Sequence, residues 1–212
     1  MHNWKLHWLE AAGDFADVRS RITTEVETTY LLVSKLIDPP KVDILMQWGD
    51  RVIPEIGMVG NAYRKDLFSL TFDRGNPNFR ASLANEVLRR QIAHEVHHCA
   101  RYENPGYGSS LKEAIVSEGL AGLFVKEIFG NPPEPWECAV TPDVAASFFN
   151  EAVHAESYDH AAWFYGRSKN YPRSLGYTLG YLAAVRWRET EPAANGARLI
   201  TVSAVDVLAV WQ

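Results

Sequence analysis

Residues 94–98 read His-Glu-Val-His-His and lie within a segment, about 79–101, that we predict to be one long helix. On an α-helix, His94 and His98 stand about one turn apart, so both imidazoles project from the same face. Glu95 lies about 100° away around the helix, where it can face a water on a metal without binding the metal. Because neutral imidazole is a good zinc ligand, the run predicts a zinc site on this helix.

A third ligand is expected, because a catalytic zinc of this kind keeps three protein ligands and one water. The next helix is opened by the capping-box residues 110–113 and closed by Gly130. Glu118 interrupts an apolar stripe of this helix, and a buried carboxylate without a partner is costly. The stripe consists of Leu111, Ala114, Ile115, Gly122 and Val125. We therefore predict Glu118 as the third ligand; the alternatives are an ion pair with an arginine, or Glu113 as the ligand, although capping already explains Glu113.

Two further interpretations of the motif stay open. The first is that residues 94–98 are only a polar helix face that carries three histidines. The second concerns His97, which cannot share the face of His94 and His98 and is either exposed to solvent or in contact with a ligand. Of the two cysteines, Cys99 lies about 100° around the helix from His98, which favours a packing role.

The rest of the chain changes character along its length. Helical spacing over residues 14–37 ends at Asp38-Pro39-Pro40 and is followed by a short β-like segment, 42–46. Residues 57–64 and 67–72 read as two adjacent strands or a hairpin. Three further helical segments follow the capped helix, at 143–155, 159–168 and 173–189, and the last residues are ambiguous between strand and helix.

This order predicts an α+β fold, with a small mixed sheet followed by an active-site helix and a mainly helical C-terminal part. We expect a single domain over residues 1–212, with a cleft between a sheet-containing half, 1–102, and a helical half, 103–212. The apolar fraction of 47% and charged fraction of 22% are ordinary for a globular protein.

Charge and hydropathy limit the partners. The net charge of −5, with no basic stripe, argues against nucleic acid. No apolar run is long enough for a membrane span, and the N-terminal residues lack the apolar run of a signal peptide. Two cysteines cannot form a disulfide framework, so we expect free thiols and a cytoplasmic location. Nothing in the sequence indicates an oligomeric state.

The zinc motif followed by Ser117-Glu118-Gly119-Leu120-Ala121 resembles the gluzincins, zinc peptidases with an HExxH helix and a glutamate ligand on a later helix. More narrowly, about residues 80–185 are similar to the YjaZ-like family of bacterial predicted zinc-dependent proteases. The resemblance implies a zincin-like fold, one Zn²⁺ held by His94, His98 and Glu118, and a peptide or unfolded protein as substrate. The thermolysin-like ExxxD form is absent, because residue 122 is Gly.

The same resemblance suggests an oxyanion donor. The family has a Gly-Tyr-x-x-Gly-Tyr segment late in the domain, which residues 176–181 match, and the glycines of this segment give one helix face a smooth surface for close packing. Because a Tyr, His or Arg commonly stabilises the oxyanion in zinc peptidases, Tyr177 is the first candidate and Arg173 the second. The alternative is that Tyr177 and Tyr181, four residues apart, pack a seam between helices.

Asn61 and Ala62, followed by Tyr63, resemble the edge strand with which thermolysin-like enzymes hold an extended substrate; a plain sheet strand is the alternative.

Taken together, these patterns predict a zinc metallopeptidase in which Glu95 activates a zinc-bound water. Two functions without catalysis compete with it: a zinc-binding interaction or stress-response module, and a metal-free helical interaction domain. An intact Glu95 and only three ligands favour catalysis, since structural zinc usually has four protein ligands.

Overall fold

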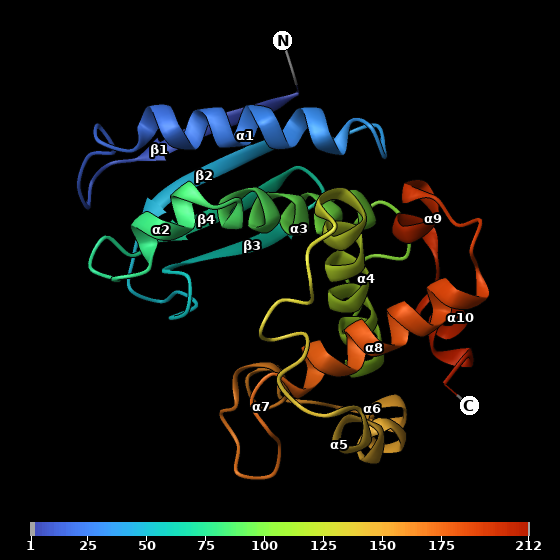
Figure 1. Cartoon of the computed structure of the whole chain (residues 1–212). Helices are drawn as coiled ribbons and strands as arrows, with labels where there is room; N and C mark the ends of the chain where they lie inside the picture. The colour runs from blue at the N-terminus through green and yellow to red at the C-terminus, as the bar shows by residue number, and fades with distance from the viewer. Residues whose placement is uncertain (1–2, 212) are drawn as a thin grey trace. The chain divides into compact units, whose positions relative to one another are not determined.

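The computed structural model describes residues 3–211, and the chain forms two compact units with a boundary after Glu103 (Figure 1). Over its described residues, 3–103, the first unit carries a four-stranded sheet with three helices, and the described part of the second unit is helical. The predicted α+β class is therefore confirmed, whereas a cleft between the two halves stays a prediction. Among residues 3–211, no helix has the length and apolar character needed to cross a membrane.

The sheet of the first unit is mixed, with strand order β1-β2-β4-β3. Its strands are β1 (Trp4–Leu9), β2 (Val42–Trp48), β3 (Met58–Arg64) and β4 (Leu67–Phe72). β2 pairs in parallel with β1 and β4, and β3 pairs antiparallel with β4. The expected hairpin over residues 57–72 is thus formed by β3 and β4, and β3 is an edge strand.

Strand β1 is an addition to the sequence prediction, which assigned no element before the helix expected over residues 14–37. Burial alternates along the strand. Trp4, Leu6 and Trp8 are buried or half-buried, whereas Lys5 and His7 between them are exposed. The Trp4 indole N–H donates to the carbonyl oxygen of Pro40 at 3.1 Å, and His7 pairs with Asp43 across the β1–β2 ladder at 2.7 Å. Period-two alternation of this kind is a strand signal.

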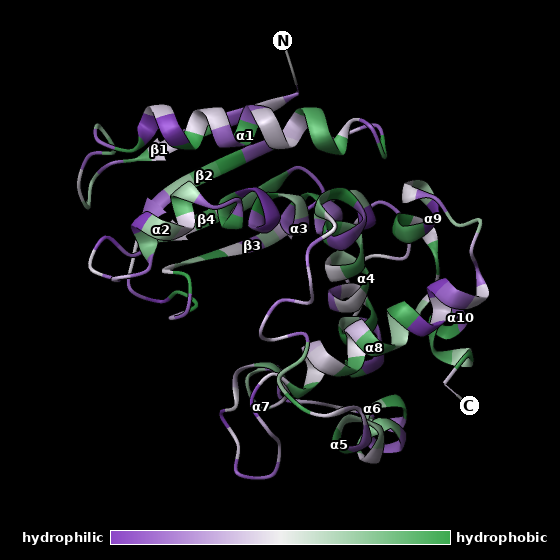
Figure 2. Cartoon of the chain, viewed as in Figure 1, coloured by the Kyte–Doolittle hydropathy of each residue, from purple (hydrophilic) through white to green (hydrophobic). Residues whose placement is uncertain are grey.

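The three helices of the first unit are α1 (Arg19–Val33), α2 (Phe79–Ala84) and α3 (Val87–Arg101). Bands of hydrophobic and hydrophilic residues alternate along α1 (Figure 2), and its buried apolar residues are Ile22, Val26 and Val33. Glu25 of α1 is also buried and forms an ion pair with Arg89 of α3. This pair fixes α1 against the helix that carries the zinc motif.

The long helix expected over residues 79–101 is interrupted. Asn85 and Glu86 leave the helical conformation, and Glu86 has φ of 69°, in the left-handed region. Such a conformation is uncommon for a residue with a Cβ. Helix α3 therefore starts at Val87 and still contains the whole of residues 94–98.

The second unit is built from α4 (Leu111–Phe129), α5 (Pro142–Ser147), α6 (Phe149–His154), α7 (His160–Tyr165), α8 (Leu175–Thr190), α9 (Gly196–Thr201) and α10 (Ala204–Ala209). Hydroxyl or carboxylate side chains cap several of these helices by accepting backbone N–H groups, as Ser110 does for α4 and Asp159 for α7. The tail that was ambiguous from the sequence is helical, because Asn195 and Ser203 cap α9 and α10.

Helices α4 and α8 cross at two glycines. A Cβ built on Gly119 would lie 1.9 Å from the carbonyl oxygen of Gly180, and one built on Gly180 would lie 2.0 Å from the carbonyl oxygen of Ile115. Only glycine permits two helix backbones to approach this closely. The crossing fixes the part of α4 that bears Glu118, since Glu118 directly precedes Gly119.

Candidate metal centre

Helix α3 presents the first two candidate ligands. The Nε2 atoms of His94 and His98 lie 3.0 Å apart, and the two rings meet edge to face with centroids 4.7 Å apart. His98 is buried and His94 half-buried. The one-turn spacing of the motif thus brings both ring nitrogens to one point, as predicted from the sequence.

This nitrogen pair has nearly the spacing that zinc requires. Two nitrogens bound at roughly 2.0–2.1 Å in a tetrahedral arrangement lie about 3.3–3.4 Å apart. The observed 3.0 Å differs by only a few tenths of an ångström. A small rotation of either ring therefore suffices for both nitrogens to bind one ion.

Glu95 lies on the side of α3 that faces strand β3. It is 5% exposed, and a Cβ built on Gly60 of β3 would come within 2.4 Å of its Cγ and Oε1. The carboxylate thus lies directly against the edge strand, and glycine at position 60 leaves the space for it. The next two residues of the strand are the expected substrate-binding ones: Asn61 is exposed and Ala62 half-buried.

The neighbours of the motif on α3 are buried. His97 has no exposed surface, which rules out the solvent-facing alternative for this residue. Cys99 is also fully buried, and burial, together with the negative charge of Glu95, raises the pKa of its thiol. A neutral buried thiol agrees with the expected packing role.

The third candidate ligand lies on α4 in the second unit. Glu118 is only 8% exposed, and its Oε1 accepts a hydrogen bond of 2.6 Å from the hydroxyl of Tyr107. Glu113 instead completes the capping box: its carboxylate accepts from the backbone N–H of Ser110 at 3.0 Å, and the Ser110 hydroxyl accepts from the N–H of Glu113. The capping role predicted for Glu113 is confirmed.

Three side chains of the second unit, Tyr107, Tyr158 and His160, lie near enough to Glu118 for its charge to affect their pKa. Desolvation first, and then the charge of Glu118, raise the pKa of Tyr107 well above its ordinary value. The same two causes raise the pKa of Tyr158. Burial lowers the pKa of His160, although the charge of Glu118 opposes that shift. The sequence prediction missed these three residues, because none of them shares a spacing pattern with Glu118.

The two candidate oxyanion donors belong to the second unit. Tyr177 lies on α8, half-buried, with its ring edge against Phe164 at 5.0 Å, and it is near enough to Tyr107 to influence the pKa of that hydroxyl. Arg173 lies in the loop before α8 and is exposed, and its backbone and Cβ lie close to Gly166. Their role as donors stays a prediction.

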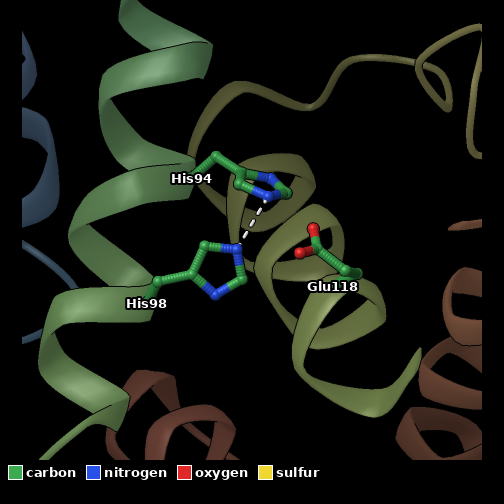
Figure 3. A group of neighbouring side chains, drawn as sticks. All are labelled: His94, His98 and Glu118. Atoms are coloured by element: carbon green, nitrogen blue, oxygen red, sulfur yellow. Dashed lines mark hydrogen bonds between the residues drawn. The ribbon is translucent and has the colours of Figure 1, made fainter. Parts of the chain in front are cut away.

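The three candidate ligands come together as a group. His94, His98 and Glu118 each offer one ligand atom, and these three atoms lie within 4.8 Å of one another, so the residues could hold a metal ion. Figure 3 shows both imidazoles projecting from one face of α3 toward the Glu118 carboxylate. Two imidazoles and one carboxylate are the ligand set of a catalytic zinc with a fourth position left for water.

Comparison with known proteins agrees with this chemistry. A family model described as "Predicted Zn-dependent protease (DUF2268)" matches residues 22–209, which include every candidate site residue, nearly all of the second unit and the first unit from α1 onward without strand β1. No curated protein and no solved structure matches the chain. The match confirms the resemblance to the YjaZ-like proteases, and the chain belongs to this family of predicted zinc-dependent proteases.

Proposed function

We propose that the chain is a zinc metallopeptidase in which His94, His98 and Glu118 hold one zinc ion and Glu95 is the general base. The convergence of the three ligand atoms within 4.8 Å is the observation that carries the proposal. The family match supports zinc-dependent proteolysis in general terms. When bound, zinc lowers the pKa of a water molecule and polarises the scissile carbonyl.

Glu95 suits the role of a base because it lies on the helix of the two histidines without sharing their face. Its carboxylate would take the proton from the attacking water and then give it to the leaving amine. Burial against β3 holds it in one position, since the strand approaches as closely as Gly60 allows. A fixed base loses less entropy in the reaction than a mobile one.

The edge strand supports a peptide as substrate. Strand β3 pairs on one side with β4, and its sequence includes the exposed Asn61 and the half-buried Ala62. An extended peptide could add to the outer edge of β3 through main-chain hydrogen bonds, which makes the interaction largely independent of peptide sequence. This binding mode requires an unfolded segment, so we propose unstructured peptides or unfolded proteins as the substrates.

Transition-state stabilisation needs a hydrogen-bond donor besides the metal. Tyr177 is the donor that we propose, because it lies near Tyr107, the residue that donates a hydrogen bond to Glu118. Arg173 is the second candidate, because its exposed position before α8 would let its side chain approach a bound peptide. In either case the donor would act mainly in the transition state.

The function is tested by hydrolysis of an unstructured protein by the zinc-loaded wild type and the Glu95→Gln variant. The proposal predicts that Glu95→Gln keeps the zinc and the fold but loses activity about 10²–10⁴-fold, the usual loss for a general base. Equal behaviour of the two proteins against a broad set of unfolded proteins and peptides would favour a zinc-binding interaction module without catalysis.

A further inference from the structure

The carboxylate of Glu118 has a protein partner of its own. The hydroxyl of Tyr107 donates a hydrogen bond of 2.6 Å to Oε1 of Glu118. Glu118 is 8% exposed, so this bond is shielded from water. Both residues belong to the second unit and lie 11 positions apart in the sequence. The contact is therefore a local property of α4 and the loop that precedes it.

The loop holds Tyr107 in place from both sides. Gly106 and Gly108 have φ of 80° and 93°, a backbone conformation that residues with a Cβ rarely adopt. A Cβ built on Gly108 would lie 2.1 Å from the Cβ of Glu113, so the loop runs close against the first turn of α4. The Glu113 carboxylate also accepts from the backbone N–H of Ser109 at 3.0 Å. The loop is thus tied to the helix that bears Glu118.

The Tyr107 ring gives the loop a second attachment. It packs against an apolar cluster of the second unit that is formed by α4, α7, α8 and neighbouring segments. With the ring packed there and the backbone held at Glu113, the hydroxyl has little freedom to leave Glu118. An ordinary tyrosine hydroxyl is protonated near neutral pH and can therefore donate to a carboxylate.

We propose that Tyr107 is a positioning residue for the third metal ligand: its hydroxyl engages one carboxylate oxygen of Glu118, so that only the other oxygen binds the ion. The inference rests on the proposed zinc site. A carboxylate oxygen that accepts a strong hydrogen bond is a weaker metal ligand, so the bond favours monodentate binding. Monodentate binding keeps the ion four-coordinate, with the fourth position open to water, as a hydrolytic site requires.

The test compares metal binding by the wild type, Tyr107→Phe and the control Tyr158→Phe. Phenylalanine keeps the ring of Tyr107 and removes only the hydroxyl. Tyr158 serves as the control because it is also a tyrosine near Glu118, close enough for the charge of Glu118 to affect its pKa. Zinc affinity is measured by competition with a chromophoric chelator. Tyr107→Phe should bind zinc about 10–100-fold more weakly, the usual loss when an outer partner of a ligand is removed, because the lost orientation of Glu118 outweighs what its second oxygen gains as a ligand. Tyr158→Phe should bind zinc as the wild type does.

Cobalt substitution provides a readout that a merely structural role would not change. If Glu118 turns bidentate in Tyr107→Phe, bound Co²⁺ gains a fifth ligand atom and its visible absorption becomes weaker than in the wild type. Both measurements are made at a temperature where circular dichroism shows the variant folded. Unchanged zinc affinity with an unchanged cobalt spectrum in Tyr107→Phe overturns the inference and leaves the zinc site intact.

The remaining outcomes are also decisive. A Tyr107→Phe chain that does not fold at any temperature contradicts a positioning role, which predicts a folded chain with a weaker site. A loss of zinc affinity in Tyr158→Phe equal to that in Tyr107→Phe contradicts it as well, because the effect would not depend on the Glu118 hydrogen bond. If the wild type itself binds no zinc, the proposed function fails, and the inference that rests on it fails with it.

Discussion

Replacing Gly119 with alanine tests the helix crossing that holds Glu118. The new Cβ would lie 1.9 Å from the carbonyl oxygen of Gly180 and 2.1 Å from its carbonyl carbon. Ordinary contact begins near 3.4 Å, so α8 has to move by about 1.5 Å relative to α4. Both obstacles are backbone atoms of a helix and cannot rotate away as a side chain could.

The sign of the effect separates packing from helix propensity. Propensity alone favours alanine over glycine in a helix by about 1 kcal/mol. Overpacking an interior costs about 1–3 kcal/mol. We expect a cost near the upper end of that range, because the obstacle is a helix backbone that cannot rotate away. We therefore expect a net loss of about 2 kcal/mol in the free energy of unfolding. For a chain of this size, that loss lowers Tm by roughly 4–8 °C.

Thermal and urea unfolding followed by circular dichroism measure this loss. Gly75→Ala is a control outside the helices: Gly75 lies exposed in a turn, and the atom closest to its added Cβ, apart from the adjacent residues, is a carboxylate oxygen of Asp73 at 3.3 Å. It should change stability by less than about 0.5 kcal/mol. Gly180→Ala should destabilise like Gly119→Ala, and the double variant should cost less than the sum, because both act on one crossing. A Gly119→Ala protein as stable as the wild type, or more stable, would refute the reasoning.

Three further predictions concern the site and its helix. Gly60→Ala should displace Glu95, which lies 2.4 Å from the added Cβ, and lower the hydrolysis rate roughly 10–100-fold with zinc content unchanged; an unchanged rate would mean that β3 does not hold the base. Native-state alkylation read by mass spectrometry should modify the exposed Cys138 and spare Cys99, because burial shields that thiol and raises its pKa; equal modification of both would contradict the packing of α3. Tyr177→Phe should lower kcat and kcat/KM together and leave zinc binding intact, whereas wild-type rates would move the oxyanion role to another donor.

Local patterns predicted the elements that carry the candidate ligands. The spacing of His94 and His98 and the capping box at Ser110 depend on residues within one or two turns, and both appear in the structure as expected. The glycines of residues 176–181 predicted close packing of their helix, and Gly180 bears this out at the α4–α8 crossing. The mixed sheet followed by helices also agrees with the α+β prediction.

What the sequence did not reveal depends on contacts or on backbone conformations with no local signal. The break at Glu86 requires a left-handed φ. Glycine is the usual sequence signal for that conformation, and a glutamate gives no such signal. Tyr107 lies in a loop without periodicity, and only the folded loop brings its hydroxyl to Glu118. Strand β1 did carry an alternating signal, but tryptophans and histidine in a short N-terminal segment are ambiguous until β2 is present as a partner.

Zinc content tests the central claim most directly. The protein is purified without added zinc or chelator, titrated with zinc, and measured by inductively coupled plasma mass spectrometry. We expect about one equivalent per chain in the wild type. Glu118→Gln should lose most of the zinc, whereas Glu113→Gln should retain it and lose only about 1 kcal/mol of stability through its cap. Full zinc occupancy in Glu118→Gln, or its loss in Glu113→Gln instead, would contradict the assignment of the metal centre to His94, His98 and Glu118.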